Sequence, residues 1–175
     1  MSFILTQVTG AIALILVCIS YFLHSKNNFL IFQIFANIFY ALSFVFTGSL
    51  VAGIGTFISI YRVLLFYILE RKNQNIPFFL IIIFSTLYIT NGILFFKSYL
   101  DIIPICTSIL FTVAMWMKNI QFVRYFMILP NVLIAIYALL CQAYVTACLD
   151  FIEAIVVIIA IIKYHLEQKK IQLTI

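Results

Sequence analysis

Long apolar runs separated by short polar breaks make up almost the whole chain. The runs cover approximately residues 3–23, 29–46, 49–69, 77–96, 99–117, 123–141 and 144–164. A helix crosses a bilayer core of about 30 Å with about 20 apolar residues, whereas a barrel strand needs only about 10 residues of alternating polarity. The run lengths therefore predict an all-α membrane protein with seven transmembrane helices. Two breaks, Thr47-Gly48 and Gln142-Ala143, carry no charge.

The basic residues support these two uncharged turns independently. If the breaks alternate between two faces, one face holds a single basic residue in its breaks, Lys97. The other face receives Lys26, Arg71, Lys72, Lys118, Arg124, Lys163, Lys169 and Lys170. The positive-inside rule then predicts an N-terminus outside and a C-terminus in the cytoplasm.

Composition excludes most soluble functions. The chain of 175 residues is 66% hydrophobic and 9% charged, against about 25% charged in soluble domains. Its net charge of +5 comes from residues in the breaks, so we expect it to set topology rather than to bind nucleic acid. The cysteines form no CxxC pair and lie in apolar runs, which predicts small buried side chains, no metal site and no cofactor. They are Cys18, Cys106, Cys141 and Cys148.

The chain also repeats itself. When it is shifted by 94 residues, the boundaries of the first three runs fall on those of the last three, and the two uncharged turns coincide. Asn37 falls on Asn131, which places an amide inside the same run of each half. The pattern predicts two parallel three-helix repeats, residues 1–75 and 98–175, joined by a linker helix in residues 76–97. Transporters built from parallel repeats are known, with the site near the midplane between the repeats.

Short motifs give the chain a family resemblance. They are Leu5-Thr6-Gln7 with Gly10, the break after Phe22, Ser59-Ile60-Tyr61-Arg62, and Asp101 to Pro104. Over its full length the chain resembles the bacterial inner-membrane YgjV family. Its three, one and three helices with the N-terminus outside resemble the SWEET, PQ-loop and MtN3 superfamily. The resemblance implies a SWEET-like fold in the bacterial inner membrane, and it implies little about the substrate.

The prolines depart from the pattern of the sugar-transporting SWEET proteins, which carry prolines in both halves. Here the second half has Pro104 and Pro130, whereas the equivalent positions of the first half are Gly10 and Ala36. We take Gly10, Pro104 and Pro130 as candidate hinges. Prolines in only one half place a symmetric rocking movement in doubt.

Polar residues inside the runs are candidates for a pathway, because intramembrane charges are costly and usually face the bundle interior. Thr56, Ser59 and Arg62 are three apart and share one helical face, as do Asp150 and Glu153. The 94-residue shift places Thr56 on Asp150 and Ser59 on Glu153, so we expect the two stripes to face each other.

Within these stripes we predict an ion pair between Arg62 and Glu153. It would line a solute pathway, or alternatively only fix helix packing. Asn37 and Asn131 are open to the same two interpretations, with interhelical hydrogen bonds as the packing role.

The function favoured by these residues is a transporter or facilitator of a small polar solute, with alternating access between the repeats. Proton coupling would pass through Asp150 or Glu153. The alternative is a non-transporting receptor or structural membrane protein of SWEET-like fold. The sequence contains no HExxH or GxSxG motif, so we do not expect an enzyme. The expected partners are membrane lipid and an unidentified solute, and the chain is expected to act as a monomer or a homo-oligomer.

Overall fold

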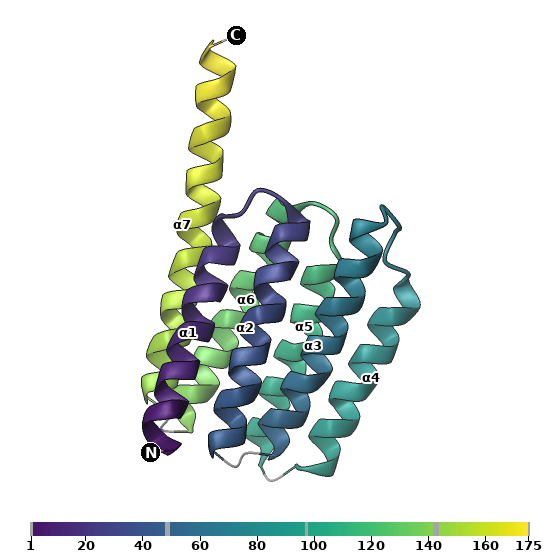
Figure 1. Cartoon of the computed structure of the whole chain (residues 1–175), viewed down its shortest axis with the longest axis vertical. Coiled ribbons are helices and arrows are strands. Elements are labelled where there is room, and N and C mark those ends of the chain that lie inside the picture. The colour runs from purple at the N-terminus through teal and green to yellow at the C-terminus, as the bar shows by residue number, and fades with distance from the viewer. Residues whose placement is uncertain (1, 48–49, 97, 142–143, 175) are drawn as a thin grey trace.

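The computed structural model describes residues 2–47, 50–96, 98–141 and 144–174. In these ranges the chain forms seven α-helices and one short 3₁₀ helix, η1 (Figure 1). Their bounds are α1 Ser2–Phe22, α2 Lys26–Thr47, α3 Leu50–Arg71, α4 Phe78–Leu94, η1 Tyr99–Asp101, α5 Ile102–Trp116, α6 Ile120–Leu140 and α7 Tyr144–Thr174. The predicted uncharged turns fall between α2 and α3 and between α6 and α7, and their central residues lie outside the described ranges, as does Lys97.

Apolar helices long enough to cross a membrane account for much of the described chain. Four segments meet both conditions, Ile4–Phe22, Gly53–Arg71, Tyr99–Trp116 and Ile120–Leu140. The helix Phe78–Leu94 is apolar but shorter. Many large apolar side chains on the outer faces of the helices are exposed, which suits a surface in contact with lipid tails. The prediction of an all-helical protein with membrane-crossing helices is confirmed at this level.

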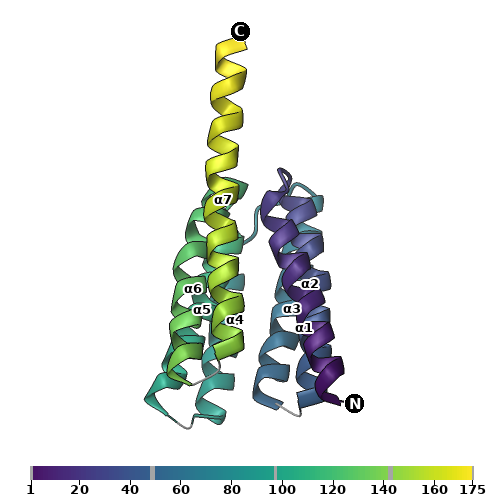
Figure 2. The same ribbon diagram turned by 90° about the vertical axis from the view of Figure 1, so that its left-hand side faces the viewer.

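The helices form two layers. In one layer α2 lies between α1 and α3, and in the other α6 lies between α5 and α7 (Figures 1 and 2). The layers meet at two edges, where α1 packs against α7 and α3 packs against α5. At the second edge α4 contacts both α3 and α5. At these edges α3 thus faces α5, and α7 faces α1.

Local sequence explains where the helices begin and end. After α3, Asn73 adopts a positive φ of 54°, a conformation that asparagine tolerates better than most residues. Pro77 precedes α4, where its missing N–H costs no helical hydrogen bond. Ser98 and Asp101 form a capping box at η1, and the side chain of Asn119 accepts a hydrogen bond from the Gln121 amide at the start of α6.

The last helix is longer than the apolar run that predicted it. The run ends near residue 164, yet α7 continues to Thr174 and projects beyond the other helices (Figure 1). The extension contains leucine, glutamate, glutamine and lysine, which all have high helix propensity. The polar tail is therefore a continuation of the helix.

The hydrophobic core lies mainly in one half of the bundle, toward the end that carries the basic loops. Its members come mainly from the last turns of α1, α3 and α5, from the first part of α2, α4 and α6, and from the middle of α7. They include Val17, Tyr21, Phe29, Leu30, Val63, Phe66, Leu80, Phe84, Met115, Val123, Met127, Val157 and Ile161. We call this end of the bundle the basic end. Toward the opposite end, many buried positions are alanine or threonine, such as Ala41, Thr107 and Ala138.

A close approach between α4 and α5 depends on Gly92. A side-chain carbon added at Gly92 would overlap the side chain of Ile105 on α5. We expect Gly92→Val to lower the melting temperature, because overpacking costs about 1–3 kcal/mol, or roughly 2–4 °C per kcal/mol in a chain of this size. Gly53→Val is the matched control, since nothing lies within 4 Å of a carbon added there. Equal losses from both variants would show that Gly92 is not a contact point.

Candidate functional site

A hydrogen-bonded group built on Glu153 links the two layers. The Tyr21 hydroxyl on α1 donates to Glu153 Oε1 on α7 at 2.7 Å. The Asn131 side-chain amide on α6 donates to the Tyr21 hydroxyl at 3.4 Å. Tyr21 and Asn131 are each only 1% exposed. A carboxylate, a phenol and an amide thus meet inside an apolar bundle, where each polar group needs a partner.

A further carboxylate lies next to this group. Asp150 lies one turn along α7, and its Oδ2 is a buried atom with no hydrogen-bond partner among the described residues. We call Tyr21, Asn131, Asp150 and Glu153 the carboxylate site. Asp150 Oδ2 can still accept a hydrogen bond there, whereas Glu153 Oε1 already accepts one from Tyr21.

Asn37 and Asn131, which the 94-residue shift aligns, make different contacts. Asn131 reaches across to the carboxylate site. Asn37 instead donates to the Gln33 carbonyl of its own helix at 2.7 Å. The Gln33 side chain in turn donates to Ser20 Oγ at 3.0 Å, which ties α2 to α1 within one layer. Asn131 is therefore the stronger candidate of the two for a pathway.

Arg62 forms a second polar group at the opposite edge. Its guanidinium donates to Thr112 Oγ1 at 2.8 Å and to the Ser108 carbonyl at 3.3 Å, both on α5. It also lies over the Tyr88 ring of α4, 5.5 Å from the ring centroid. Ser59, one turn earlier on α3, is 2.8 Å from the Tyr88 hydroxyl. Thr56, on the same face, is also buried.

The predicted ion pair between Arg62 and Glu153 is wrong. Among the described residues the ion pairs are His24–Glu167, Lys26–Glu70 and Lys163–Glu167. The reason is the order of helices in the layers. The prediction required α3 and α7 to face each other, but they lie at opposite edges of the bundle. The stripe containing Arg62 therefore faces α4 and α5, and the stripe containing Glu153 faces α1 and α6.

The candidate hinges differ in their positions within helices. Pro104 lies in the first turn of α5, where proline removes no helical hydrogen bond. Pro130 lies inside α6 and is buried, one residue before Asn131. Proline inside a helix removes a backbone hydrogen bond, so Pro130 is the better-placed hinge. Gly10 is inside α1, where an added side-chain carbon would lie 3.8 Å from Ser43 Oγ.

Three partners in these groups were not predicted from the sequence: Tyr21, Tyr88 and Thr112. Each sits in an apolar run and carries one hydroxyl, which is common in membrane helices. A signal was present for Thr112, since Ser108 and Thr112 are four apart and place two oxygens on one face of α5.

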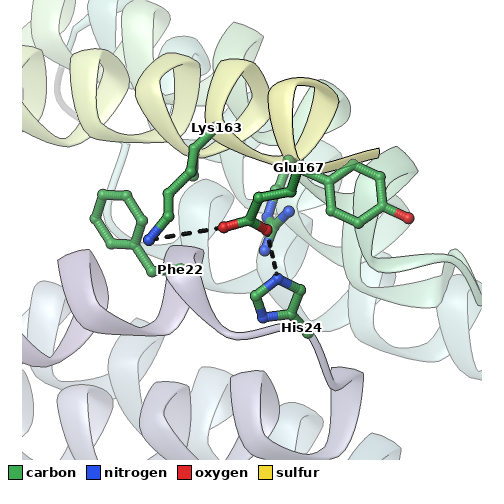
Figure 3. Close-up of a pocket in the computed structure, with 7 residues that line it drawn as sticks. Phe22, His24, Lys163 and Glu167 are labelled. Carbon is green, nitrogen blue, oxygen red and sulfur yellow. Dashed lines mark hydrogen bonds and ion pairs between the residues drawn. The ribbon is translucent and has the colours of Figure 1, made fainter. Parts of the chain in front are cut away.

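At the basic end a cluster around Glu167 ties α1 to α7 (Figure 3). His24 Nε2 lies 3.0 Å from Glu167 Oε2, and Lys163 Nζ lies 4.0 Å from Oε1. The Lys163 ammonium also sits 5.7 Å from the centroid of the Phe22 ring. Arg124, on α6, donates to the Leu23 carbonyl at 2.8 Å and so links the layers at the same place.

The Glu167 contact predicts a pH dependence. The hydrogen bond with His24 lowers the pKa of Glu167. A carboxyl group with a lowered folded-state pKa stabilises the fold above its unfolded pKa of about 4.3, and this contribution is lost as pH falls through the lowered value. We therefore expect wild type to melt slightly above Glu167→Gln at pH 7, by a few degrees at most because the pair is exposed. A difference that does not shrink once the pH has fallen below the lowered pKa of Glu167 would contradict this sign.

Contacts between the layers are concentrated at the basic end and at mid-depth. Besides Arg124 and His24, the Trp116 indole of α5 donates to the Ile76 carbonyl of the loop after α3 at 2.8 Å. Toward the other end, the hydrogen bonds described stay within a layer, as from Ser43 to the Thr6 carbonyl. Figure 2 shows α1 and α7 approaching each other at the basic end and diverging toward the N-terminus of α1. The layers are thus fastened together at the basic end and at mid-depth.

No group of three or more histidine, cysteine, aspartate or glutamate side chains in the described ranges is placed to hold a metal ion. The polar groups of the bundle therefore offer hydrogen bonds and single charges. Such groups recognise polar solutes or move protons, and in membrane proteins they commonly mark these pathways.

Comparison with known proteins gives a family. Neither a curated protein nor a solved structure matches the chain significantly. A family model described as bacterial inner membrane protein, Imp-YgjV, matches residues 4–168. The matched residues include the carboxylate site, the Arg62 group and the four long apolar segments. With nearly the whole chain covered by that match, the protein belongs to the Imp-YgjV family of bacterial inner membrane proteins.

Proposed function

We propose that this protein is a transporter or facilitator of a small polar solute, with the carboxylate site as its solute-binding and proton-handling centre. The observation that carries the proposal is the hydrogen bond between Tyr21 and Glu153 across the two layers. It places a titratable group at the contact between two bodies that would have to separate. In this role the chain would neither catalyse a reaction nor bind nucleic acid.

The chemistry of the site suits coupling to protons. The ionised Glu153 carboxylate accepts a hydrogen bond from Tyr21, whose hydroxyl in turn accepts one from Asn131. Protonation would remove the charge of Glu153 and add a donor, which weakens its attraction for the Tyr21 hydroxyl. A solute hydroxyl or amine would compete with the Tyr21 hydroxyl for the same carboxylate. Loss of the bond from Tyr21 would then release α1 from α7, and Asp150 offers a second acceptor nearby.

The wider architecture of the proposal is a SWEET-like arrangement of seven membrane spans, with two parallel three-helix repeats and α4 as the linker. The serial packing of α1, α2 and α3, and of α5, α6 and α7, supports it. The loops after α1, α3 and α5 lie at the same end as the extension of α7 (Figure 1). These segments carry the basic residues, so the positive-inside rule favours a cytoplasmic basic end and an N-terminus outside.

Alternating access would then begin from a conformation closed on the cytoplasmic side. Support comes from the large core side chains near the basic end and from the fastening contacts of Arg124, Trp116 and His24. Opening toward the cytoplasm would break these contacts. Both layers belong to one chain, so a monomer suffices to enclose the path, and a homo-oligomer remains compatible.

A screen for ligand-induced thermal stabilisation tests the proposal. Purified protein would be heated with single sugars, amino acids, polyols and small carboxylates. We expect one chemical class to raise the melting temperature of wild type and of Glu167→Gln, and to have a much smaller effect on Glu153→Gln. Ligand at 100 times its dissociation constant adds about 2.7 kcal/mol to stability. Stabilisation of Glu153→Gln equal to that of wild type would remove Glu153 from the site.

The second candidate is a non-transporting receptor or structural membrane protein. The observation in its favour is that Arg62 is 3% exposed and takes its hydrogen-bond acceptors, Thr112 and Ser108, from its own chain. A group held in this way has the properties of packing rather than of a pathway. Absence of uptake for every solute that stabilises the protein would favour this candidate.

A further inference from the structure

A cavity of about 350 Å³ opens at the basic end, on the edge away from the Glu167 cluster. Its walls come from the start of α2, the end of α3, the loop before α4 and the end of α5. The volume lies within the range of about 300–1,000 Å³ that is typical of small-molecule sites. The carboxylate site and the Arg62 group contribute no residue to this cavity.

The charged residues of the cavity favour an anion. Lys26 is 7% exposed, and its ammonium lies 2.9 Å from Glu70 Oε2. Lys118 also lines the cavity and is close enough to Lys26 for the two positive charges to repel. Within the described residues Lys118 has no ion pair. Two ammonium groups face one carboxylate, so the cavity has an excess positive charge that an anion would neutralise.

The remaining walls favour an amphipathic anion. Ile76, Trp116 and Met117 supply apolar surface, and Gln74 and Asn75 supply amide groups. The Trp116 indole N–H is held by the Ile76 carbonyl, and its ring packs edge-on against Phe78 with centroids 6.1 Å apart. Tryptophan at the end of a membrane helix marks the headgroup level of the bilayer. The neighbouring apolar and basic walls thus match the chemistry of a lipid where its phosphate joins the glycerol and acyl chains.

We propose that this cavity binds the headgroup of an anionic glycerophospholipid, with Lys118 and Lys26 on the phosphate and Trp116 against the glycerol and first acyl carbons. A bound lipid of this kind would bridge the end of α5 and the loop before α4. It would strengthen the closure of the layers at the basic end. The proposal is independent of solute transport, because none of these residues belongs to the carboxylate site.

Native mass spectrometry of the purified protein tests the site, with phosphatidylglycerol and phosphatidylcholine offered at equal concentration. We expect wild type to retain phosphatidylglycerol preferentially. Lys118→Gln should reduce that preference roughly fivefold, the effect expected for one basic residue at a lipid surface. Lys169→Gln, the control, removes the same charge from the exposed extension of α7 and should leave the preference intact. Equal losses from both variants, or no preference in wild type, would overturn the site.

Two further arms identify the occupant. Glycerol 3-phosphate carries the same phosphate without acyl chains, and we expect it not to displace phosphatidylglycerol. Full displacement would show that the cavity takes a soluble phosphate and would overturn the lipid assignment. Glu153→Gln should retain phosphatidylglycerol as wild type does, whatever its effect on solute binding. A loss of lipid in that variant would contradict the separation of the two sites.

Discussion

Glu153→Gln is expected to lower solute uptake into proteoliposomes by roughly 10- to 100-fold. The substitution keeps the shape of the side chain but removes its charge and its ability to exchange a proton. A hydrogen bond to a charged group is worth about 1.5–3 kcal/mol, which corresponds to this range of rates or affinities. The measurement is the initial rate of uptake of the solute that stabilises wild type, with and without a pH gradient.

Two variants make the Glu153 result specific. Lys169→Gln removes a charge from the exposed extension of the same helix, and we expect nearly normal uptake. Tyr21→Phe removes the hydroxyl that Glu153 accepts from, so its uptake should be reduced less than that of Glu153→Gln while its dependence on pH changes. Uptake by Glu153→Gln at the wild-type rate, with the same pH dependence, would contradict the role of this carboxylate.

Arg62→Met is expected to raise the melting temperature. Arg62 is a buried cation with no ion pair among the described residues, and its Nε has no hydrogen-bond partner there. Its removal leaves the neighbours satisfied, because Thr112 Oγ1 still donates to the Ser108 carbonyl and Tyr88 keeps Ser59. Replacing buried charged groups with apolar side chains stabilises some proteins by about 1–4 kcal/mol. At roughly 2–4 °C per kcal/mol, the increase is measurable by a thermal shift in detergent.

The control for Arg62 is Arg71→Met, which changes an exposed arginine at the end of the same helix. It should leave the melting temperature nearly unchanged. A fall of several degrees for Arg62→Met would mean that the contacts with Thr112, Ser108 and Tyr88 outweigh the cost of burying the charge. Arg62 would then be a structural residue, as the non-transporting alternative requires.

The pattern of apolar runs along the chain predicted the helical class of the fold. Run lengths predicted an all-helical chain. At each uncharged turn one helix ends before the turn and the next begins after it. Local signals explain where α4 and α6 begin, because Pro77 and Asn119 stand immediately before their first residues. The extension of α7 was not predicted, because hydropathy measures apolar length and is blind to a polar helix outside the membrane.

Relationships between helices were predicted less well. The sequence singled out Arg62 and Glu153 as buried charges, but it could not show which helices lie side by side. Pairing them assumed that repeat mates face each other, whereas α3 faces α5 and α7 faces α1. The partners Tyr21 and Thr112 also escaped prediction, because one hydroxyl in an apolar run has many possible neighbours. Helix order in the layers is set by packing across the whole bundle, which periodicity within one helix does not contain.

The central claim is that the two layers separate at the basic end during transport. It is tested most directly by uptake through protein locked at that end. The four native cysteines would first be replaced, and His24 and Glu167 would then each be substituted by cysteine. A short, reducible crosslinker would join these two new cysteines. We predict that the lock stops uptake of the stabilising solute and that reduction restores it, while binding of that solute persists. Undiminished uptake through the locked protein would contradict the account.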